Sequence, residues 1–170
     1  MNLISKYKLQ ILKSLPLIIF YFLIFNSFDG LREIETLNNF SFKLQMIIIY
    51  FYVLKFPDQL GLGHVFLGGI LNDIILGTPM GTSSLSFLIL AFFTSYMKNV
   101  TLRSKMSAEW FTFIPALFFS NLVYFIIINN FSNLSFYYLE LLRSSFFTFL
   151  FFPIFYYLFN NYQKLISKRE

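Results

Sequence analysis

The residues best suited to chemistry lie together in one stretch, residues 61–81, which reads GLGHVFLGGILNDIILGTPMG. This stretch holds six of the chain's seven glycines, its one histidine, His64, and an acid, Asp73, inside an apolar run. A carboxylate near the centre of a membrane-spanning helix costs roughly 2.5–3.5 kcal/mol on insertion scales. Asp73 is therefore expected to face protein or water, and a binding or catalytic group is to be sought here first.

Asp73 has a functional and a structural interpretation. In the functional one it is a proton or ligand site. In the structural one it is a buried polar group that hydrogen-bonds to the backbone of the turn at residues 78–84. The apolar runs contain no second acid and no base that could pair with it. The structural interpretation is therefore favoured, and the functional one stays open.

The other polar residues do not combine into a catalytic or metal-binding set. His64 precedes Asp73 by nine residues, which is about 13 Å along a helix, so the two side chains do not touch. One histidine without a second histidine or a cysteine makes a poor metal site. The hydroxyls of residues 82–86 have no neighbouring base to activate them. We therefore expect no catalytic, cofactor-binding or metal-binding residue, and a protein that is not an enzyme.

The composition indicates a membrane protein. Of 170 residues, 57% are hydrophobic and 12% are charged, whereas a soluble domain carries about 25% charged residues. So few charges cannot cover a water-facing surface. The chain contains no cysteine, which excludes disulfides, thiolate nucleophiles and cysteine-type zinc sites. The length predicts a single integral membrane domain over residues 1–170.

The apolar runs predict an all-α protein with six transmembrane helices, which must position the 61–81 stretch. A bilayer core requires roughly 20 apolar residues, with a range of about 17–25. The predicted spans are about 11–28, 40–56, 60–76, 84–97, 110–128 and 138–159. The first could also be a signal peptide, but no small-residue cleavage site follows it, so we interpret it as a transmembrane helix. The second, third and fourth spans are short, so they stand nearly upright or end in backbone that neighbouring helices shelter.

The basic residues predict the orientation of the bundle. Six spans place both termini on one side, which then carries ten of the 13 Lys and Arg residues, against three on the other side, namely Arg32, Lys43 and Arg143. Because positive residues mark the cytoplasmic side, both termini are expected in the cytoplasm. This charge then lies beside the anionic lipid headgroups. The aromatic residues lie apart from it, within the spans, so nucleic-acid binding is not expected.

Small residues in the third predicted span indicate a packing face. Gly69, Asp73 and Gly77 are spaced four residues apart, so they line one side of a helix, with Gly68 beside them. Small residues at this spacing let another helix backbone approach closely. Asn121, in the middle of the fifth predicted span, is likewise expected to hold helices together rather than to contact a substrate.

A longer pattern surrounds this face. It reads P-x(3)-G-x-G, followed by G-x(3)-D-x(3)-G-x-P-x-G, and is formed by Pro57, Gly61, Gly63, Gly69, Asp73, Gly77, Pro79 and Gly81. Together with six predicted spans in a chain of this length, the pattern resembles the MreD family of bacterial rod shape-determining membrane proteins. His64 and Asn72 lie outside the family pattern.

The resemblance implies a function, partners and a fold. It implies a non-enzymatic, multi-pass scaffold in the bacterial inner membrane that maintains rod shape and supports lateral peptidoglycan synthesis. The implied partner is an MreC-like bitopic protein, in a complex with MreB, a RodA-like glycosyltransferase and a penicillin-binding transpeptidase. MreD-like proteins are also similar in fold to the substrate-binding S components of energy-coupling-factor vitamin transporters. That similarity supplies the alternative function, which requires a polar or aromatic pocket open to the outer face.

Overall fold

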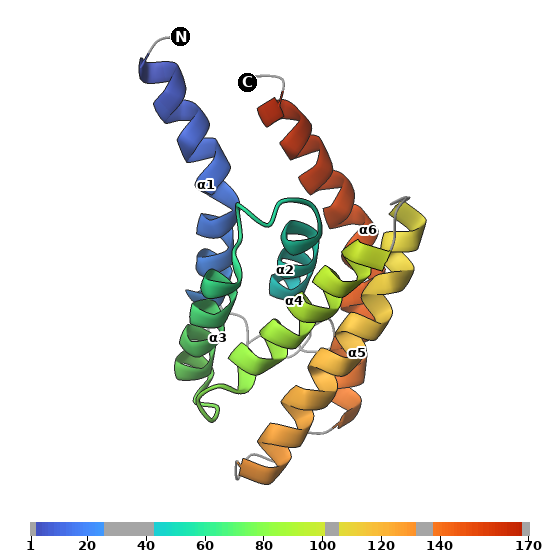
Figure 1. Cartoon of the computed structure of the whole chain (residues 1–170). Helices are drawn as coiled ribbons and strands as arrows, with labels where there is room; N and C mark the ends of the chain where they lie inside the picture. The colour runs from blue at the N-terminus through green and yellow to red at the C-terminus, as the bar shows by residue number, and fades with distance from the viewer. Residues whose placement is uncertain (1–2, 26–42, 101–105, 132–137, 168–170) are drawn as a thin grey trace, which may run out of the picture.

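The computed structural model describes residues 3–25, 43–100, 106–131 and 138–167. Over these ranges the chain forms six α-helices and no strand (Figure 1). The predicted all-α class is confirmed, and each predicted span overlaps one helix. The helices are α1 (Leu3–Phe25), α2 (Leu44–Lys55), α3 (Leu62–Leu76), α4 (Thr82–Val100), α5 (Met106–Phe131) and α6 (Tyr138–Ser167).

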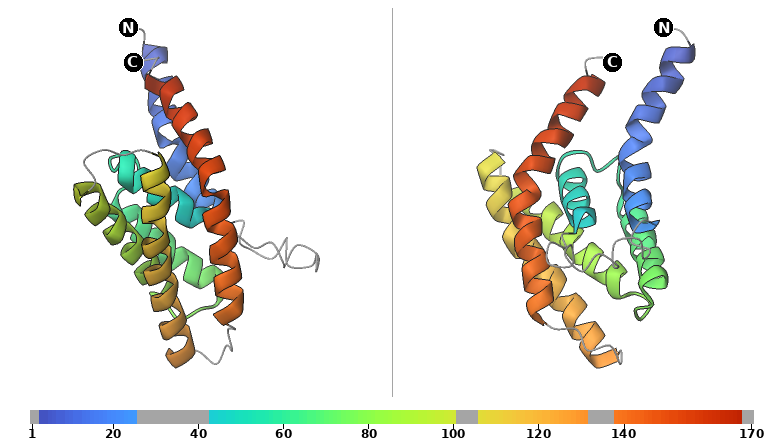
Figure 2. Two further views of the ribbon diagram at one scale, coloured as in Figure 1. Left: turned by 90° about the vertical axis from the view of Figure 1, so that its right-hand side faces the viewer. Right: turned by 180° about the vertical axis from the view of Figure 1, so that it is seen from behind.

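Two helices lie side by side at one end of the bundle. The start of α1 and the end of α6 extend together beyond the other helices in every view (Figures 1 and 2). The Tyr162 hydroxyl on α6 donates to the Leu12 carbonyl on α1 at 2.8 Å, which joins the two helices. The α3–α4 turn lies at the opposite end. The bundle therefore has a terminal end and a hairpin end.

The short helix α2 forms the centre of the bundle. Its residues from Met46 to Val53 are all buried, and α1, α4 and α6 pack around it. A helix that is hydrophobic on every side belongs in an interior. Its 12 residues span about 18 Å, which is shorter than the roughly 30 Å of a bilayer core. Neighbouring helices enclose α2, and the Lys43 backbone N–H before it donates to Thr148 Oγ1 of α6 at 2.9 Å.

Three aromatic rings join α2 to the two long C-terminal helices. The Tyr50 ring centroid lies 4.7 Å from that of Phe113 on α5 and 5.5 Å from that of Phe152 on α6. Phe113 and Phe152 are themselves 4.7 Å apart. Aromatic pairs of this kind contribute about 0.5–1.5 kcal/mol each beyond their buried area. The same contacts fix where α5 begins relative to α2.

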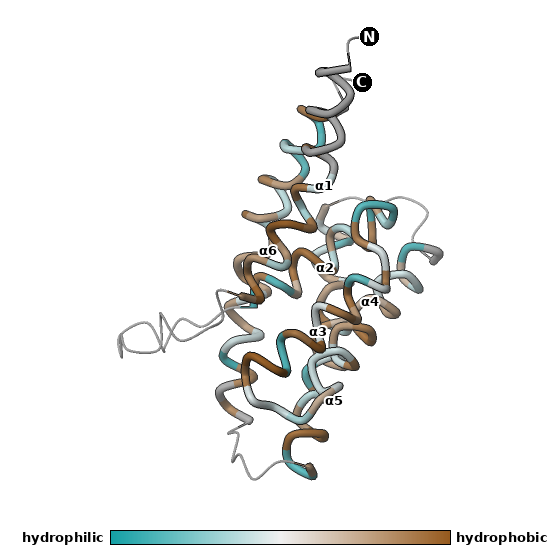
Figure 3. Tube along the Cα trace, turned by 90° about the vertical axis from the view of Figure 1, so that its left-hand side faces the viewer, coloured by the Kyte–Doolittle hydropathy of each residue, from teal (hydrophilic) through white to brown (hydrophobic). Residues whose placement is uncertain are grey.

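The two C-terminal helices are long and apolar enough to cross a membrane. They are Met106–Phe131 and Leu141–Ile166, and only 33% and 28% of their most apolar stretches are buried inside the protein. A core helix of a soluble protein is mostly buried, so this exposure favours a lipid-facing surface. Figure 3 colours the residues of certain placement by their hydropathy. The large apolar side chains exposed on these two helices include Phe111, Ile114, Phe118, Phe119, Ile126, Phe146, Leu150, Ile154, Tyr157 and Leu158.

Several helices extend beyond the predicted spans. The helix α5 begins at Met106 rather than at Trp110, and α6 continues to Ser167 rather than ending at Phe159. A helix does not have to stop where its apolar run stops, because polar side chains are tolerated beyond the hydrocarbon core. This difference matters for function, since it places Glu109 inside the first turn of a helix.

Two candidate sites at opposite ends of the bundle

Asp73 closes the hairpin between α3 and α4. Its side chain is fully buried. Oδ1 accepts hydrogen bonds from Thr78 Oγ1 at 2.9 Å and from the Ser83 backbone N–H at 2.8 Å, and Oδ2 accepts one from the Gly81 backbone N–H at 2.8 Å. All three donors lie between residues 78 and 83, as the structural interpretation predicted. The Ser83 N–H also lies in the first turn of α4, where a helix favours a negative partner.

Two glycines give the hairpin its backbone conformation. Gly77 ends α3 with φ +65° and Gly81 has φ +97°, a region that glycine enters without steric cost. The Thr78 backbone N–H donates to the Asp73 carbonyl at 3.1 Å, which closes the end of α3. A side chain at Gly77 would meet open space. The predicted packing role of Gly77 is therefore wrong, because this residue shapes the turn and no helix approaches it.

Close helix approach is confirmed at Gly69 and found also at Gly68. A Cβ atom at Gly69 would collide with the backbone of Ser84 on α4. Ser84 Oγ donates to the Phe66 carbonyl at 3.1 Å, which holds α4 against α3 at this point. A Cβ atom at Gly68 would collide with the Phe20 ring of α1. The two glycines thus let α3 pack between α1 and α4.

The remaining motif residues shape the ends of α3. Pro57 lies in the turn after α2, and Gly61 precedes the first residue of α3, where its carbonyl accepts the Val65 N–H at 3.2 Å. A side chain at Gly61 or Gly63 would meet nothing within 4 Å, so neither glycine is a packing contact. At the other end, the Pro79 carbonyl accepts Thr82 Oγ1 at 2.7 Å.

His64 and Asn72, outside the family pattern, have separate roles. His64 is exposed, and its Nδ1 lies 3.4 Å from the Tyr21 hydroxyl. Asn72 is buried, and its Nδ2 donates to Ser83 Oγ at 2.8 Å. Within the described ranges, no three His, Asp or Glu side chains gather in a way that could hold a metal ion.

Asn121 joins α5 to two other elements, as predicted for a residue that holds helices together. Its Nδ2 donates to Ser145 Oγ of α6 at 2.9 Å, and its Oδ1 accepts from Lys43 Nζ at 3.1 Å. Lys43 Nζ also lies 4.7 Å from the centroid of the Tyr124 ring, within cation–π range. This lysine was predicted on the outer side of the membrane, and it lies beside the start of α2.

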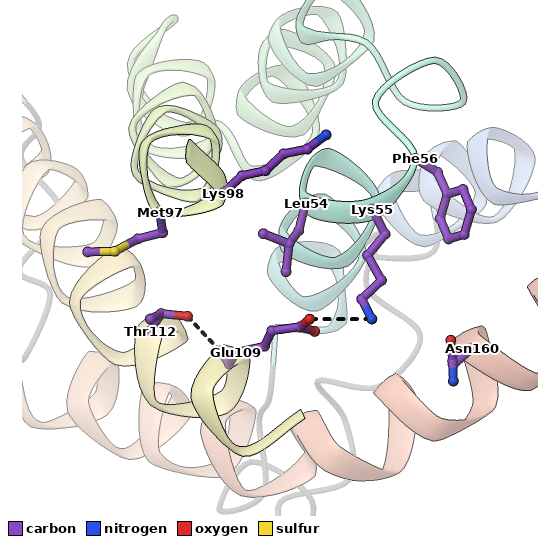
Figure 4. Close-up of a pocket in the computed structure, with 8 residues that line it drawn as sticks. All are labelled: Leu54, Lys55, Phe56, Met97, Lys98, Glu109, Thr112 and Asn160. Atoms are coloured by element: carbon purple, nitrogen blue, oxygen red, sulfur yellow. Dashed lines mark hydrogen bonds and ion pairs between the residues drawn. The ribbon is translucent and has the colours of Figure 1, made fainter. Parts of the chain in front are cut away.

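A second candidate site lies where α2 and α4 end and α5 begins, on the terminal side of the bundle. It is a cavity of about 460 Å³ (Figure 4). Three of its lining residues are apolar and the others are charged or polar, so the cavity is amphipathic. They are Leu54, Lys55, Phe56, Met97, Lys98, Glu109, Thr112 and Asn160.

Glu109 is the central polar group of this cavity. Its side chain is 3% exposed, and Lys55 Nζ lies 3.4 Å from its Oε1. Neither carboxylate oxygen accepts a hydrogen bond from any described residue. Lys55 Nζ instead donates to the Tyr156 hydroxyl at 2.5 Å. A buried carboxylate is stable only when it is both paired and hydrogen-bonded, so Glu109 has unused acceptor capacity.

The position of Glu109 is fixed through its backbone. Its carbonyl accepts hydrogen bonds from the Tyr50 hydroxyl at 2.8 Å and from Thr112 Oγ1 at 3.0 Å. Tyr50 belongs to the aromatic cluster at the centre of the bundle, so the first turn of α5 is anchored to α2. The carboxylate is therefore held in place while its oxygens are left without donors.

Sequence reasoning missed Glu109. The fifth predicted span begins at Trp110, so Glu109 lies just outside it, and the search for acids within the apolar runs did not include it. One signal was present, because Glu109 is a lone acid beside basic residues at the start of a helix, where acids are favoured. Its partner Lys55 is distant in sequence and could be identified only from the packing of α2 against α5.

Comparisons of this chain with models of protein families, with curated proteins and with solved structures find no match. The resemblance to the MreD family therefore depends on the eight motif residues and on the pattern of apolar runs. The structure gives most of those motif residues a local structural role, at the ends of α3 or against α4.

Proposed function

We propose that this protein is a scaffold of the MreD type in the bacterial inner membrane. It maintains rod shape and supports lateral peptidoglycan synthesis without catalysis, by binding an MreC-like bitopic partner. The observation that carries the proposal is the α3–α4 hairpin. Its acid, Asp73, directs both carboxylate oxygens to the turn that it closes, and Gly69 lies against Ser84. Within the family motif, Asp73 and Gly69 thus fix the α3–α4 hairpin, and a scaffold requires such a rigid element.

The exposed surface supports a membrane location. Large apolar side chains are exposed on both long C-terminal helices, and a bilayer would cover them. In the proposed arrangement six helices cross the inner membrane, both termini are cytoplasmic, and the α3–α4 hairpin faces the periplasm. The short central α2 is sheltered by its neighbours, so its length is compatible with this arrangement.

Co-purification and cell shape test this function together. The tagged chain is isolated from native membranes with mild detergent, and proteins that accompany it are identified. We expect an MreC-like bitopic protein in the eluate and rounded cells after depletion of the chain. Gly69→Leu should lower membrane abundance and fail to restore rod shape, whereas Gly63→Leu, in the same helix with open space around it, should restore it. Rod-shaped cells after depletion would overturn the proposal.

The same eluate distinguishes the alternative function. An S component of a vitamin transporter would co-purify with an ATPase-linked transducer and a vitamin-sized ligand. Such a protein requires a pocket open to the outer face. The cavity around Glu109 is lined by the ends of α2 and α4 and by the start of α5. In Figure 1 the end of α4 and the start of α5 lie toward the terminal end of the bundle, which is the cytoplasmic side in the proposed orientation. Its position therefore does not favour the alternative.

A further inference from the structure

We propose that the cavity around Glu109 binds the headgroup of an aminophospholipid, whose primary ammonium group bonds to the Glu109 carboxylate. The inference rests on the membrane location in the proposed function, and it adds a ligand site that the scaffold role does not require. It also gives a role to Glu109, a buried acid that the hairpin does not use.

The first argument is the state of the carboxylate. Glu109 is 3% exposed, and both of its oxygens lack a hydrogen-bond donor among the described residues. Lys55 supplies charge at 3.4 Å but directs a hydrogen bond to Tyr156. A primary ammonium carries N–H donors, and hydrogen bonds between charged groups are the strong ones. A ligand with such a group would supply Glu109 with the hydrogen bonds that Lys55, at 3.4 Å and bonded to Tyr156, does not make.

The second argument is the arrangement of the other lining groups. Figure 4 shows Lys55 and Glu109 directed toward one another, whereas Lys98 extends from the end of α4 away from that pair. Lys98 is exposed, and a lysine is a mobile point charge suited to a phosphate. A zwitterionic headgroup has the two charges that this lining complements: an ammonium for the acid and a phosphate for the lysines. Leu54, Phe56 and Met97 supply apolar contacts for the start of the acyl chains.

The third argument is the level of the cavity in the membrane. Exposed tyrosines lie close in sequence to lining residues on both flanking helices: Tyr96 precedes Met97 on α4, and Tyr157 lies about one turn before Asn160 on α6. Trp110 follows Glu109, and its Nε1 donates to the Phe149 carbonyl at 2.9 Å. Tryptophan and tyrosine gather where a membrane protein meets the headgroup region. These residues place the cavity at the level of lipid headgroups.

The chain offers a reporter for this site. Trp110 is its one tryptophan and follows Glu109 in the first turns of α5, so a ligand that displaces this part of α5 should change its fluorescence. The full chain, purified in a non-ionic detergent, is titrated with phosphatidylethanolamine, phosphatidylcholine and phosphatidylglycerol of identical short acyl chains. We expect saturable binding of phosphatidylethanolamine and at least tenfold weaker binding of phosphatidylcholine, whose quaternary ammonium has no N–H. A tenfold change corresponds to about 1.4 kcal/mol.

Variants connect the preference to named side chains. Glu109→Gln should reduce the preference for phosphatidylethanolamine over phosphatidylcholine at least tenfold. Lys98→Gln should weaken the binding of phosphatidylethanolamine severalfold. Arg143→Gln removes the same charge near the start of α6, and should change nothing. Circular dichroism and gel filtration check that each variant is folded. If Glu109→Gln does not fold, the comparison of lipids on the wild-type chain still decides the matter.

Several results would overturn the proposal. Equal binding of phosphatidylethanolamine and phosphatidylcholine would remove the role of the ammonium. Binding of phosphatidylglycerol as tight as that of phosphatidylethanolamine would mean that the cavity recognises only a phosphate, through its lysines. Soluble phosphoethanolamine that binds as tightly as the lipid would make the ligand a free metabolite. None of these results alters partner binding or cell shape, so a failure here is distinguishable from a failure of the scaffold function.

Discussion

Two glycines of α3 have different surroundings, and this difference predicts opposite effects for one substitution. Gly69→Ala places a Cβ atom against the Ser84 backbone, whereas Gly63→Ala places it in open space. Overpacking typically costs about 1–3 kcal/mol. Alanine in place of glycine stabilises the middle of a helix by about 0.5–1 kcal/mol, and Gly63, in the first turn of α3, should gain less than this. Denaturation of the two purified variants in one detergent should show Gly69→Ala less stable than wild type and Gly63→Ala more stable. Equal stability of the two would contradict the close contact between α3 and α4.

The hydrogen bonds of Asp73 predict a graded response to substitution. From sequence, an amide at this position should largely preserve folding. The structure changes this expectation, because Oδ1 accepts two bonds and Oδ2 accepts one from the Gly81 N–H. An asparagine would direct its NH₂ group, itself a donor, at one set of these donors. The Asp73→Asn variant should therefore lose about 1–3 kcal/mol of stability.

Asp73→Ala removes every acceptor and should cost more than Asp73→Asn. Membrane abundance and thermal stability measured on both variants test the order. An Asp73→Asn protein that is fully stable yet does not restore rod shape would point instead to a role for the charge. That result would move Asp73 back to the proton or ligand interpretation.

At the scale of helices, local partners could be predicted and distant ones could not. The donors to Asp73 lie five to ten residues after it, so the short segment of sequence that contains the acid also contains its partners. Glu109 and Lys55 come from separate helices and meet only because α2 lies at the centre of the bundle. The apolar runs indicate where the helices lie in the sequence, but they carry no information on which helix lies at the centre of the bundle. The α3–α4 hairpin was therefore predictable, and the cavity was not.

A pair of serines joins α4 to α5 and tests how these helices are held. Ser86 Oγ and Ser120 Oγ lie 2.7 Å apart, and each also donates to the carbonyl of the other residue, at 3.0 and 2.9 Å. Both side chains are buried. Such polar contacts between membrane helices are worth about 0.6 kcal/mol on average, and about 1.7 kcal/mol at most.

A double-mutant cycle measures this contact. The variants are Ser86→Ala, Ser120→Ala and the double alanine, and each is unfolded in the same detergent. The coupling free energy should be about 0.5–1.5 kcal/mol in favour of the wild-type pair. A coupling free energy of zero would mean that the two hydroxyls act independently, each through its bond to the carbonyl of the other residue.

At the scale of the whole molecule, the structure indicates how the bundle would be held together in the membrane proposed for it. In lipid, helices associate through close packing and interhelical hydrogen bonds rather than through burial of apolar surface from water. The bundle uses both means, with glycines of α3 against two neighbouring helices and serine or asparagine bonds across α4, α5 and α6. Its outer faces are left apolar. The composition predicted this distribution, but only the structure identifies the contacts.

The last prediction tests the proposed orientation of the bundle in the membrane. The wild-type chain contains no cysteine, so one introduced thiol reports the location of one residue. Met80 lies in the hairpin and is 77% exposed, and Ser107 lies exposed in the first turn of α5, near the cavity. If the hairpin is periplasmic, a membrane-impermeant maleimide should label Met80→Cys in intact spheroplasts and should label Ser107→Cys only after permeabilisation. The reverse pattern would invert the orientation and turn the Glu109 cavity toward the outer leaflet, where a transporter pocket would be expected. Labelling of both in intact spheroplasts would place the two ends on one side and would contradict a membrane-spanning bundle.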